Sequence, residues 1–407
     1  MEGGITINKY LPIAIIYFFF NAFMLPNGLL YTTILTPLLL LWIRFSTLKR
    51  SLGIYFMIMV PFAIAHYLNG VYIKYYLISS TLLLSVYIFS IAFYQFLVVC
   101  KTLRTIYKVL LVANFYLCLL AIIALLAIPS LREILWSQTV LSYKIEDVNR
   151  LQLFTYEPSY YATLLTPLAL YYYLKAFLKK LPDPVTTILY ITLPLILSLS
   201  MGVISALVIS LSITMLVNIS AFFSRPKLAL YIITGGMALT IFLLVGFLAF
   251  PESIVFKRLI NIFEGHDTSF HGRTNDAFFL GWNVAKMKSL FWGAGLGQTK
   301  VLGPDLWFKL YKFTFTQNEI AIPNAVADTL AVFGIAGVCI RLSLQIYFYF
   351  KTKVSSNHYR LALFIFAFIY QFTGSFIYNI AEYVIWIMAF SNIFPEFNKK
   401  TPIERNQ

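Results

Sequence analysis

Long apolar runs separated by short polar segments dominate this 407-residue chain. We predict about twelve membrane-crossing helices, because runs approaching 20 apolar residues match the thickness of a bilayer. The predicted spans cover 10–25, 28–43, 51–67, 75–99, 109–129, 158–178, 185–200, 201–223, 228–250, 323–347, 360–378 and 382–395. Only Met201-Gly202 divides the pair at 185–223, so the sequence leaves open whether this pair is one bent helix or a hairpin of two.

Composition agrees with a membrane domain. The chain is 60% hydrophobic and 12% charged, whereas soluble domains carry about 25% charged residues. We therefore predict an all-α polytopic membrane protein, with 1–407 forming one integral membrane domain. Two polar segments, 131–157 and 251–322, are long enough to form larger loops. Within the second, 276–291 mixes apolar and basic positions, which predicts a short amphipathic helix on the membrane surface.

Charge sets the predicted orientation. Basic residues gather in the short loops on one side, whereas the other side, which carries both long loops, has basic and acidic residues in balance. Loops rich in Lys and Arg stay in the cytoplasm, so we expect both termini inside and the two long loops in the periplasm or exterior. The basic loop residues are Arg44, Lys49, Arg50, Lys101, Arg104, Lys108, Lys175, Lys179, Lys180, Arg225, Lys227, Lys351, Lys353, Arg360, Lys399, Lys400 and Arg405.

The net charge of +15 therefore reflects topology. It indicates no nucleic-acid partner, because no basic helix or sustained basic patch faces a solvent domain. The cysteines, Cys100, Cys118 and Cys339, lie in or beside apolar runs without metal-ligand spacing, which argues against a disulfide framework or zinc site. The first apolar run lacks a small-residue cleavage motif, and we expect it to be a retained helix.

The first long loop ends in Arg150-Leu-Gln-Leu-Phe-Thr-Tyr-Glu157-Pro-Ser159. Pro158 suits the first turn of a helix, which places Glu157 at the helix mouth. A carboxylate there can take a proton from a hydroxyl if burial raises its pKa toward neutrality. It can equally be an acid that the helix dipole favours at this position, and the residues alone do not separate the two interpretations.

The second long loop contains Lys257, Arg258 and Arg273. Guanidinium groups bind phosphate oxygens in pairs, so two arginines fifteen residues apart suit a diphosphate. The alternative is that they are solvated charges or contacts to lipid headgroups. Acidic and histidine residues nearby, including Glu264 and Asp267, match no metal motif, and we predict no metal site or other cofactor.

Further polar residues lie near the outer ends of predicted spans. Asn324 and Asp328 follow Pro323, and Glu382 opens the last span. Such groups are costly in hydrocarbon and usually face a polar cavity, although Asn324 also suits a helix cap. His66 and Asn69 at another span end are expected to be interfacial. The glycines between Gly293 and Gly297 lack a nucleotide-site context, and a tight turn explains them.

In order and placement, three segments resemble the O-antigen polymerase and ligase superfamily of bacterial membrane glycosyltransferases. The first is Arg150…Glu157-Pro-Ser159-Tyr-Tyr-Ala, similar to the family's R…EPS-x-x-A element. The second is Lys257-Arg258-Leu…Asp267-Thr-Ser269…Arg273, followed by the glycine turn. The third is the stretch from Pro323-Asn324-Ala to Gly337. The resemblance covers about the middle half of the chain, and no single motif is specific.

This resemblance implies a metal-independent polymerase in the bacterial inner membrane. Its substrate would be an undecaprenyl-diphosphate-linked oligosaccharide, polymerised into O-antigen, capsule or exopolysaccharide. Glu157 would be the acceptor base, while Arg258 and Arg273 neutralise the departing diphosphate. Arg150, Lys257, Ser159, Asn324 and Asp328 would contribute to substrate binding. The bilayer and a polysaccharide chain-length regulator are the other implied partners.

Three alternatives remain open. A ligase of the same superfamily typically has a histidine just before the asparagine of the post-loop helix, and Pro323 stands there instead. A lipid-linked oligosaccharide flippase would need two comparable halves around a polar cavity, and the chain shows no repeat. A transferase using a polyprenyl monophosphate sugar would carry acidic residues in the first outer loop, near 25–28, where this chain has no charge.

Overall fold

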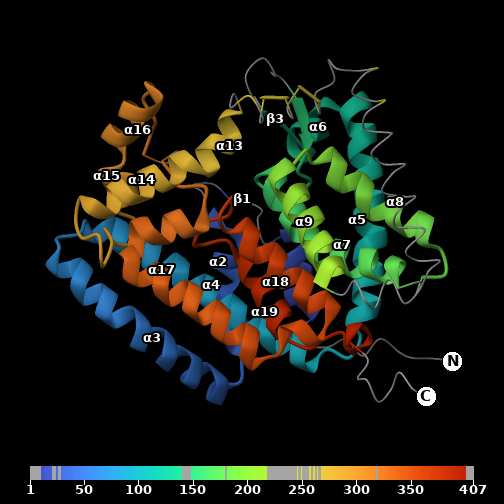
Figure 1. Ribbon diagram of the computed structural model, residues 1–407, viewed down its shortest axis with the longest axis horizontal. Helices are drawn as coiled ribbons and strands as arrows, with labels where there is room; N and C mark the ends of the chain where they lie inside the picture. The colour runs from blue at the N-terminus through green and yellow to red at the C-terminus, as the bar shows by residue number, and fades with distance from the viewer. Residues whose placement is uncertain are drawn as a thin grey trace.

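The computed structural model describes residues 11–20, 24–25, 29–139, 148–178, 181–217, 245, 249, 256–257, 260–261, 264, 267–317 and 320–399. In this part of the chain the fold is helical, with two short antiparallel hairpins (Figure 1). Strands β1 (Met24–Leu25) and β2 (Leu29–Leu30) form one, and β3 (Trp136–Thr139) and β4 (Val148–Leu151) form the other. The prediction of an all-α protein is thus confirmed.

The helices have the following bounds. In the first half they are α1 (Leu11–Ile15), η1 (Ile16–Phe20), α2 (Tyr31–Trp42), α3 (Phe45–Leu68), α4 (Ile73–Val99), α5 (Leu103–Ala127), α6 (Pro129–Leu135), α7 (Pro158–Phe177), α8 (Pro184–Leu197) and α9 (Met201–Val217). In the second half they are α13 (Thr268–Arg273), α14 (Asn275–Lys286), α15 (Thr299–Leu302), α16 (Pro304–Tyr311), α17 (Ala325–Lys351), η3 (Val354–Ser356), α18 (His358–Tyr370), α19 (Ile380–Phe390) and η4 (Pro395–Phe397).

Four helices of the described residues are long and apolar enough to cross a membrane: α3, α4, α5 and α17. Each has 24 to 27 residues, or about 36–40 Å at 1.5 Å per residue. Within the described residues, the other predicted spans correspond to shorter helices. The first, expected over 10–25, ends at Phe20 and gives way to the β1–β2 hairpin. The span expected over 228–250 lies outside the described residues apart from 245 and 249.

The pair at 185–223 consists of two helices, α8 and α9. They are separated by a short turn at 198–200, where Leu199 has a positive φ of 48°. The side chain of Arg150 holds this turn, since its Nε donates to the Ser198 carbonyl at 3.1 Å and its Nη2 to the Ser200 hydroxyl at 3.3 Å. The structure therefore divides this pair into two helices, and Arg150 supports the break from β4.

Helix α7 lies at the centre of the largest core cluster. Nearly all of its residues are buried, from Pro158 to Leu174, as expected of a helix that is apolar all round. It packs against α8, α9, α18 and α19, and the Tyr359 hydroxyl donates to the Pro167 carbonyl at 3.1 Å. Packing on all sides fixes the position of the residue that precedes α7, Glu157.

Helices α18 and α19 are shorter than a membrane is thick. With 13 and 11 residues, they extend about 20 Å and 17 Å, against about 30 Å of hydrocarbon. An irregular segment, 371–379, joins them. Its backbone bonds to the start of α17: Ala325 N donates to Gly374 O, Val326 N to Gln371 O, and Ile377 N to the Asp328 carboxylate. These partners replace the water that an apolar environment lacks.

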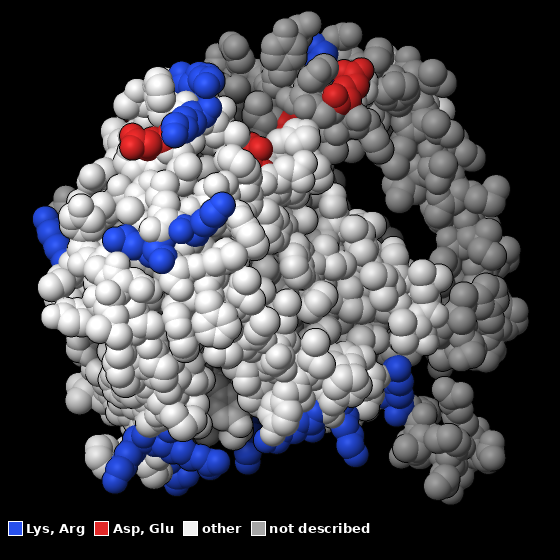
Figure 2. Space-filling view, turned by 60° about the vertical axis from the view of Figure 1, so that its left-hand side comes forward, with Lys and Arg blue, Asp and Glu red and all other residues white. Residues whose placement is uncertain are grey.

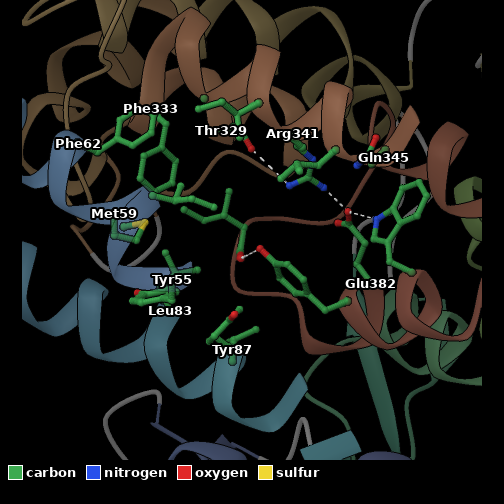
Figure 3. Close-up of a pocket in the computed structure, with 18 of the residues that line it drawn as sticks. Tyr55, Met59, Phe62, Leu83, Tyr87, Thr329, Phe333, Arg341, Gln345 and Glu382 are labelled. Carbon is green, nitrogen blue, oxygen red and sulfur yellow. Dashed lines mark hydrogen bonds and ion pairs between the residues drawn. The ribbon is translucent and has the colours of Figure 1, made fainter. Parts of the chain in front are cut away.

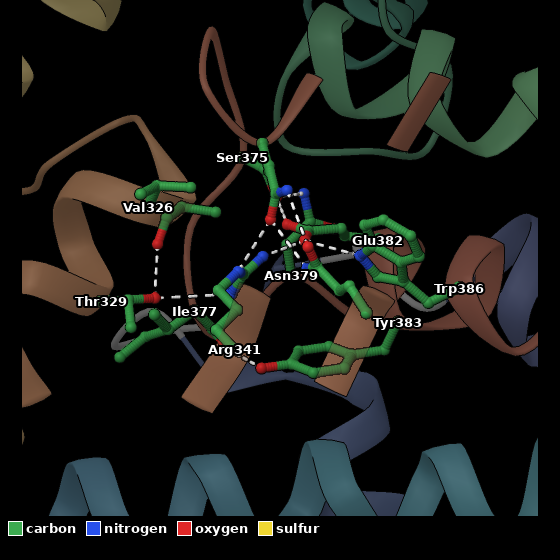
Figure 4. A network of polar contacts seen from close by, with 12 residues as sticks. Val326, Thr329, Arg341, Ser375, Ile377, Asn379, Glu382, Tyr383 and Trp386 are labelled. Atoms are coloured by element: carbon green, nitrogen blue, oxygen red, sulfur yellow. Dashed lines mark hydrogen bonds and ion pairs between the residues drawn. The ribbon is translucent and has the colours of Figure 1, made fainter. Parts of the chain in front are cut away.

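A buried ion pair fastens this segment from the other side (Figure 4). Arg341 of α17 pairs with Glu382 of α19, and their side chains are 14% and 3% exposed. Glu382 also accepts from the Ser375 hydroxyl at 2.6 Å and the Trp386 indole at 3.0 Å. Arg341 donates in addition to Gln371 at 2.9 Å. The network therefore connects α17, α18, α19 and the segment between them.

The glycine turn that follows α14 docks on a break in α17. Gly334 has φ 64° and ψ −164°, which interrupts the helix and leaves backbone groups without helical partners. Residues 290–295 supply them, since Ile335 N donates to Leu290 O at 3.0 Å and Gly295 N donates to Val332 O at 3.0 Å. A β-carbon on Gly293 or Gly334 would approach the facing backbone to 2.3 Å. Both positions therefore require glycine.

Charged side chains are separated along the molecule. At one end, called the basic end here, lie exposed Arg44, Lys49, Lys101, Arg104, Lys108, Lys351 and Lys353, at the starts of α3 and α5 and the end of α17. On the face that Figure 2 shows, a broad band without Lys, Arg, Asp or Glu separates the lower basic edge from a mixed basic and acidic region. This distribution suits a protein whose middle lies in a bilayer.

We predict that Gly334→Ala destabilises the protein, because it adds a side chain at a positive φ and against the Phe291 carbonyl. The expected loss is about 1–3 kcal/mol, measured as a lower thermal unfolding temperature of the purified protein in detergent. Gly53→Ala in α3 is the matched control, since a β-carbon there meets nothing within 4 Å. Equal stability of the two variants would contradict the docking role of Gly334.

We also predict that Arg341→Met destabilises strongly, because the Glu382 carboxylate is left buried without its cation. Breaking a buried pair costs about 3–5 kcal/mol, whereas replacing both partners by apolar residues is often near neutral. The double variant Arg341→Met/Glu382→Leu should therefore recover much of the unfolding temperature. A double variant less stable than the single one would mean that Arg341 acts chiefly through Gln371 and not through Glu382.

Candidate functional site

The sequence-predicted residues Glu157 and Arg273 meet in the structure. Glu157 precedes α7 with extended backbone angles, and Pro158 occupies the first turn as predicted. Its side chain makes no cap bond to the helix. Instead, Oε1 accepts a hydrogen bond from Arg273 Nη2 at 2.8 Å and another from the Ser159 hydroxyl. The carboxylate is 34% exposed and the guanidinium 26%, so the pair is partly accessible.

Two short helices, α13 and α14, position Arg273. It is the last residue of α13, whose start is capped by the Asp267 carboxylate accepting from Phe270 N at 2.7 Å. Helix α14 begins two residues later and packs along α17. In Figure 1, α13 and α14 lie across one end of the helical body, where α13 approaches the loop before α7. The large loop thus presents Arg273 to Glu157 from outside the core.

Asn324 connects α13, the start of α17 and the 371–379 segment. Its Oδ1 caps α17 by accepting from Val326 N and Ala327 N. Its Nδ2 donates to the Arg273 carbonyl at 2.8 Å and to the Phe372 carbonyl at 2.6 Å. Asn324 is completely buried. The predicted cap is therefore present, and the same side chain also positions Arg273 against the 371–379 segment.

Two opposing effects act on the Glu157 carboxyl. Burial raises its pKa, while the Arg273 guanidinium, the Ser159 hydrogen bond and the charge of Arg150 lower it. The lowering effects prevail, so the pKa of Glu157 is below its usual value and the group is ionised at neutral pH. The pair stabilises the fold above the ordinary pKa of a glutamate, and this contribution is lost as the pH falls through the lowered value.

The raised pKa that Glu157 would need to act as a base is therefore absent in the paired state. The partner charge outweighs burial in the paired state, and this partner, Arg273, lies 116 residues further along the chain. A carboxylate with a low pKa is a weak base while the pair persists. Its basicity would increase if another anion took over Arg273.

Of the other predicted binding residues, Ser159, Arg150 and Asn324 act on this pair. Ser159 bonds to Glu157 directly, while Arg150 holds the α8–α9 turn and acts on Glu157 through its charge. Asp328 accepts from Ile377 N at 3.1 Å and thus supports the 371–379 segment. Lys257 is described and half-buried. Arg258, the remaining predicted catalytic residue, lies outside the described residues.

The sequence analysis named Glu382 but missed the polar cluster around it. Arg341 falls inside a predicted span, and its contacts with Glu382 and Gln371 are inside the protein. Gln345 and Gln371 extend the cluster through reciprocal side-chain bonds of 2.9 Å. An arginine within an apolar run was the signal that could have found it, because such residues are rare and usually functional in membranes. No group of three His, Cys, Asp or Glu in the described part of the chain is placed to bind a metal.

Comparison with known proteins assigns this chain to no family. Neither the models of known protein families nor the curated proteins yield a match to the chain.

Proposed function

We propose that this protein is a membrane glycosyltransferase that polymerises undecaprenyl-diphosphate-linked oligosaccharides on the outer face of the bacterial inner membrane. The proposal includes about twelve spans, cytoplasmic termini and a site that faces the periplasm or exterior. It rests on the motif resemblance and on the charge distribution. The four long apolar helices are consistent with this setting.

The pairing of Glu157 with Arg273 is the observation that carries the proposal. Two residues selected as base and diphosphate-binding cation, from different loops, lie 2.8 Å apart. Both are partly exposed at the start of α7. The other end of α7 lies toward the basic end, because Tyr171 packs against Phe397 of η4, and Arg104 pairs with Glu396 of the same short helix. A base and a cation within one site are what transfer from a diphosphate to a hydroxyl requires.

The proposed reaction follows from these positions. The acceptor sugar hydroxyl gives its proton to the Glu157 carboxylate, and its oxygen forms a bond to the anomeric carbon of the donor. The bond from that carbon to the diphosphate oxygen breaks, and the electron pair leaves with the diphosphate. Arg273 stabilises the negative charge that develops there, with Arg258 as the second predicted cation. The product is a glycan longer by one unit and a free polyprenyl diphosphate.

The resting ion pair suggests how the site becomes active. A diphosphate is more highly charged than a carboxylate, so it competes with Glu157 for Arg273. Loss of the guanidinium contact removes the main influence that lowers the pKa of Glu157. Donor binding would then make Glu157 a better base at the moment when an acceptor needs deprotonation.

A flippase is the second candidate, because the Arg341–Glu382 pair lies inside a predicted span and lines a cavity. Charged groups at such depth often mark a transport route in membrane proteins. However, both charges are engaged by several partners, and Glu157 and Arg273 have no role in that reading. We therefore favour the transferase.

The first test is a gel profile of surface polysaccharide from a deletion strain. Complementation with wild type should restore a ladder of repeat units, whereas Glu157→Gln should lower polymer formation about 100-fold or more, as loss of a general base does. Equal membrane levels of the two proteins are the control. Single units that never reach the outer face would identify a flippase, and long polymer retained on its lipid would identify a ligase.

Arg273→Lys should also impair polymerisation. Lysine keeps the charge but cannot hold two phosphate oxygens in a fixed geometry, and a charged hydrogen bond is worth about 1.5–3 kcal/mol, or about ten- to a hundredfold in rate. Transfer rate in isolated membranes with lipid-linked substrate is the measurement. Lys286→Arg, exposed on α14, should leave the rate unchanged. A wild-type rate for Arg273→Lys would remove Arg273 from the proposed site.

A further inference from the structure

A cavity of about 360 Å³ lies between α3, α4, α17 and α19 (Figure 3). Its walls are mainly apolar and aromatic, and it is distinct from the Glu157–Arg273 site. The residues that line it include Tyr55, Met59, Phe62, Leu83, Tyr87, Phe333, Ile340, Leu344, Phe348 and Trp386. A space with mainly apolar walls suits an apolar ligand.

Helix α3 forms a separate wall of the cavity. Of its 24 residues only Phe62 and His66 are buried. His66, expected to be interfacial, is completely buried and contacts the Trp292 carbonyl at 2.8 Å near one end of the helix. Near the other end, the Tyr87 hydroxyl donates to the Ser51 carbonyl at 2.9 Å. Between these two attachments α3 contacts α17 through Phe62 and Phe333, whose ring centroids are 5.1 Å apart, and both rings line the cavity.

The cavity is long in one direction. Its lining follows α17 from Thr329, past the break at Gly334, to Phe348. The part after the break alone, from Gly337 to Phe348, rises about 17 Å at 1.5 Å per residue, which exceeds the depth of one leaflet, about half of the 30 Å of hydrocarbon in a bilayer. A fatty acyl chain reaches through a single leaflet, so the cavity suits a longer hydrocarbon chain.

The polar part of the wall carries no net charge. Arg341 is paired with Glu382, and it donates further to Gln371 and Thr329. An anionic headgroup therefore has no excess positive charge to bind inside the cavity. The ligand that fits is an uncharged hydrocarbon whose charged group lies elsewhere.

One end of the cavity adjoins the candidate site. Thr329 lines the cavity and follows Asp328 in α17. Asn324, little more than one turn earlier on the same helix, holds the Arg273 carbonyl. A long chain that runs along α17 thus ends close to the residues that position the proposed diphosphate-binding arginine.

We propose that this cavity holds the polyprenyl chain of a lipid-linked substrate whose diphosphate lies at Arg273. This inference rests on the proposed function. It adds a binding site for the lipid part of the substrate, formed by α3 and α17, and it gives α3 the role of a lateral wall. The chain would enter from the bilayer between the two attachments of α3.

The test measures binding of glycan-free undecaprenyl diphosphate to the full-length protein in nanodiscs, by displacement of a photoreactive polyprenyl diphosphate. Met59→Trp fills the cavity from α3, and Met57→Trp is the matched control because Met57 is 70% exposed and lines no part of it. Met59→Trp should weaken binding about tenfold, the equivalent of about two buried methylene units. Met57→Trp should bind as wild type.

A second pair of variants covers a folding failure of the first. Leu344→Trp fills the cavity from α17, and Ile346→Trp on the same helix points away from it. A farnesyl diphosphate probe, too short to occupy the cavity, should bind both variants equally. If both cavity variants bind undecaprenyl diphosphate as wild type does, the proposal is wrong, and the loss of polymer in Glu157→Gln still stands on its own.

The remaining outcomes are also decisive. Photolabelling of wild type by a phospholipid acyl probe at Met59, undiminished by undecaprenyl diphosphate, would assign the cavity to a bilayer lipid and overturn the proposal. If wild type binds no polyprenyl diphosphate at all, the cavity proposal and the proposed function fail together. Label on α3 that undecaprenyl diphosphate displaces would support both.

Discussion

The need to bond every backbone group in apolar surroundings governs this structure. Two of the departures from helical geometry among the described residues are the break at Gly334 and the segment 371–379. Each exposes backbone N–H and carbonyl groups that would cost several kcal/mol if left without partners. Helix α17 resolves both, because its break bonds to the glycine turn and its first residues bond to the 371–379 segment. The position of the large loop follows from these bonds.

The packing of α7 and the cap of α17 also fix the residues of the candidate site. Glu157 is fixed because α7 is packed on nearly all sides. Arg273 is fixed because Asn324 binds its carbonyl while capping α17. The two side chains come from segments that are remote in sequence, yet each is held by an element that the core determines. A reactive pair at the edge of a packed body can keep its geometry and still be accessible to a ligand.

Sequence pattern predicted much of the fold and the members of the central pair. Long apolar runs predicted α3, α4, α5 and α17, and the Pro158 position predicted the start of α7. The pattern failed where helices stop early. It predicted one span over 360–378, but α18 ends at Tyr370. The helix stops there because Gln371 and its neighbours bond to α17 instead of continuing the helix. The pattern of apolar residues cannot predict backbone hydrogen bonds to a distant helix.

The glycine turn has a further consequence for how this protein can change over time. Its junction with α17 is formed by backbone hydrogen bonds between 290–295 and 331–336. Side chains at most of these positions do not make the junction, and the restricted positions are three glycines with positive φ, Gly293, Gly295 and Gly334. Substitution can therefore accumulate at the other positions of both segments while the junction persists. These three glycines would then be conserved in sequences that otherwise diverge.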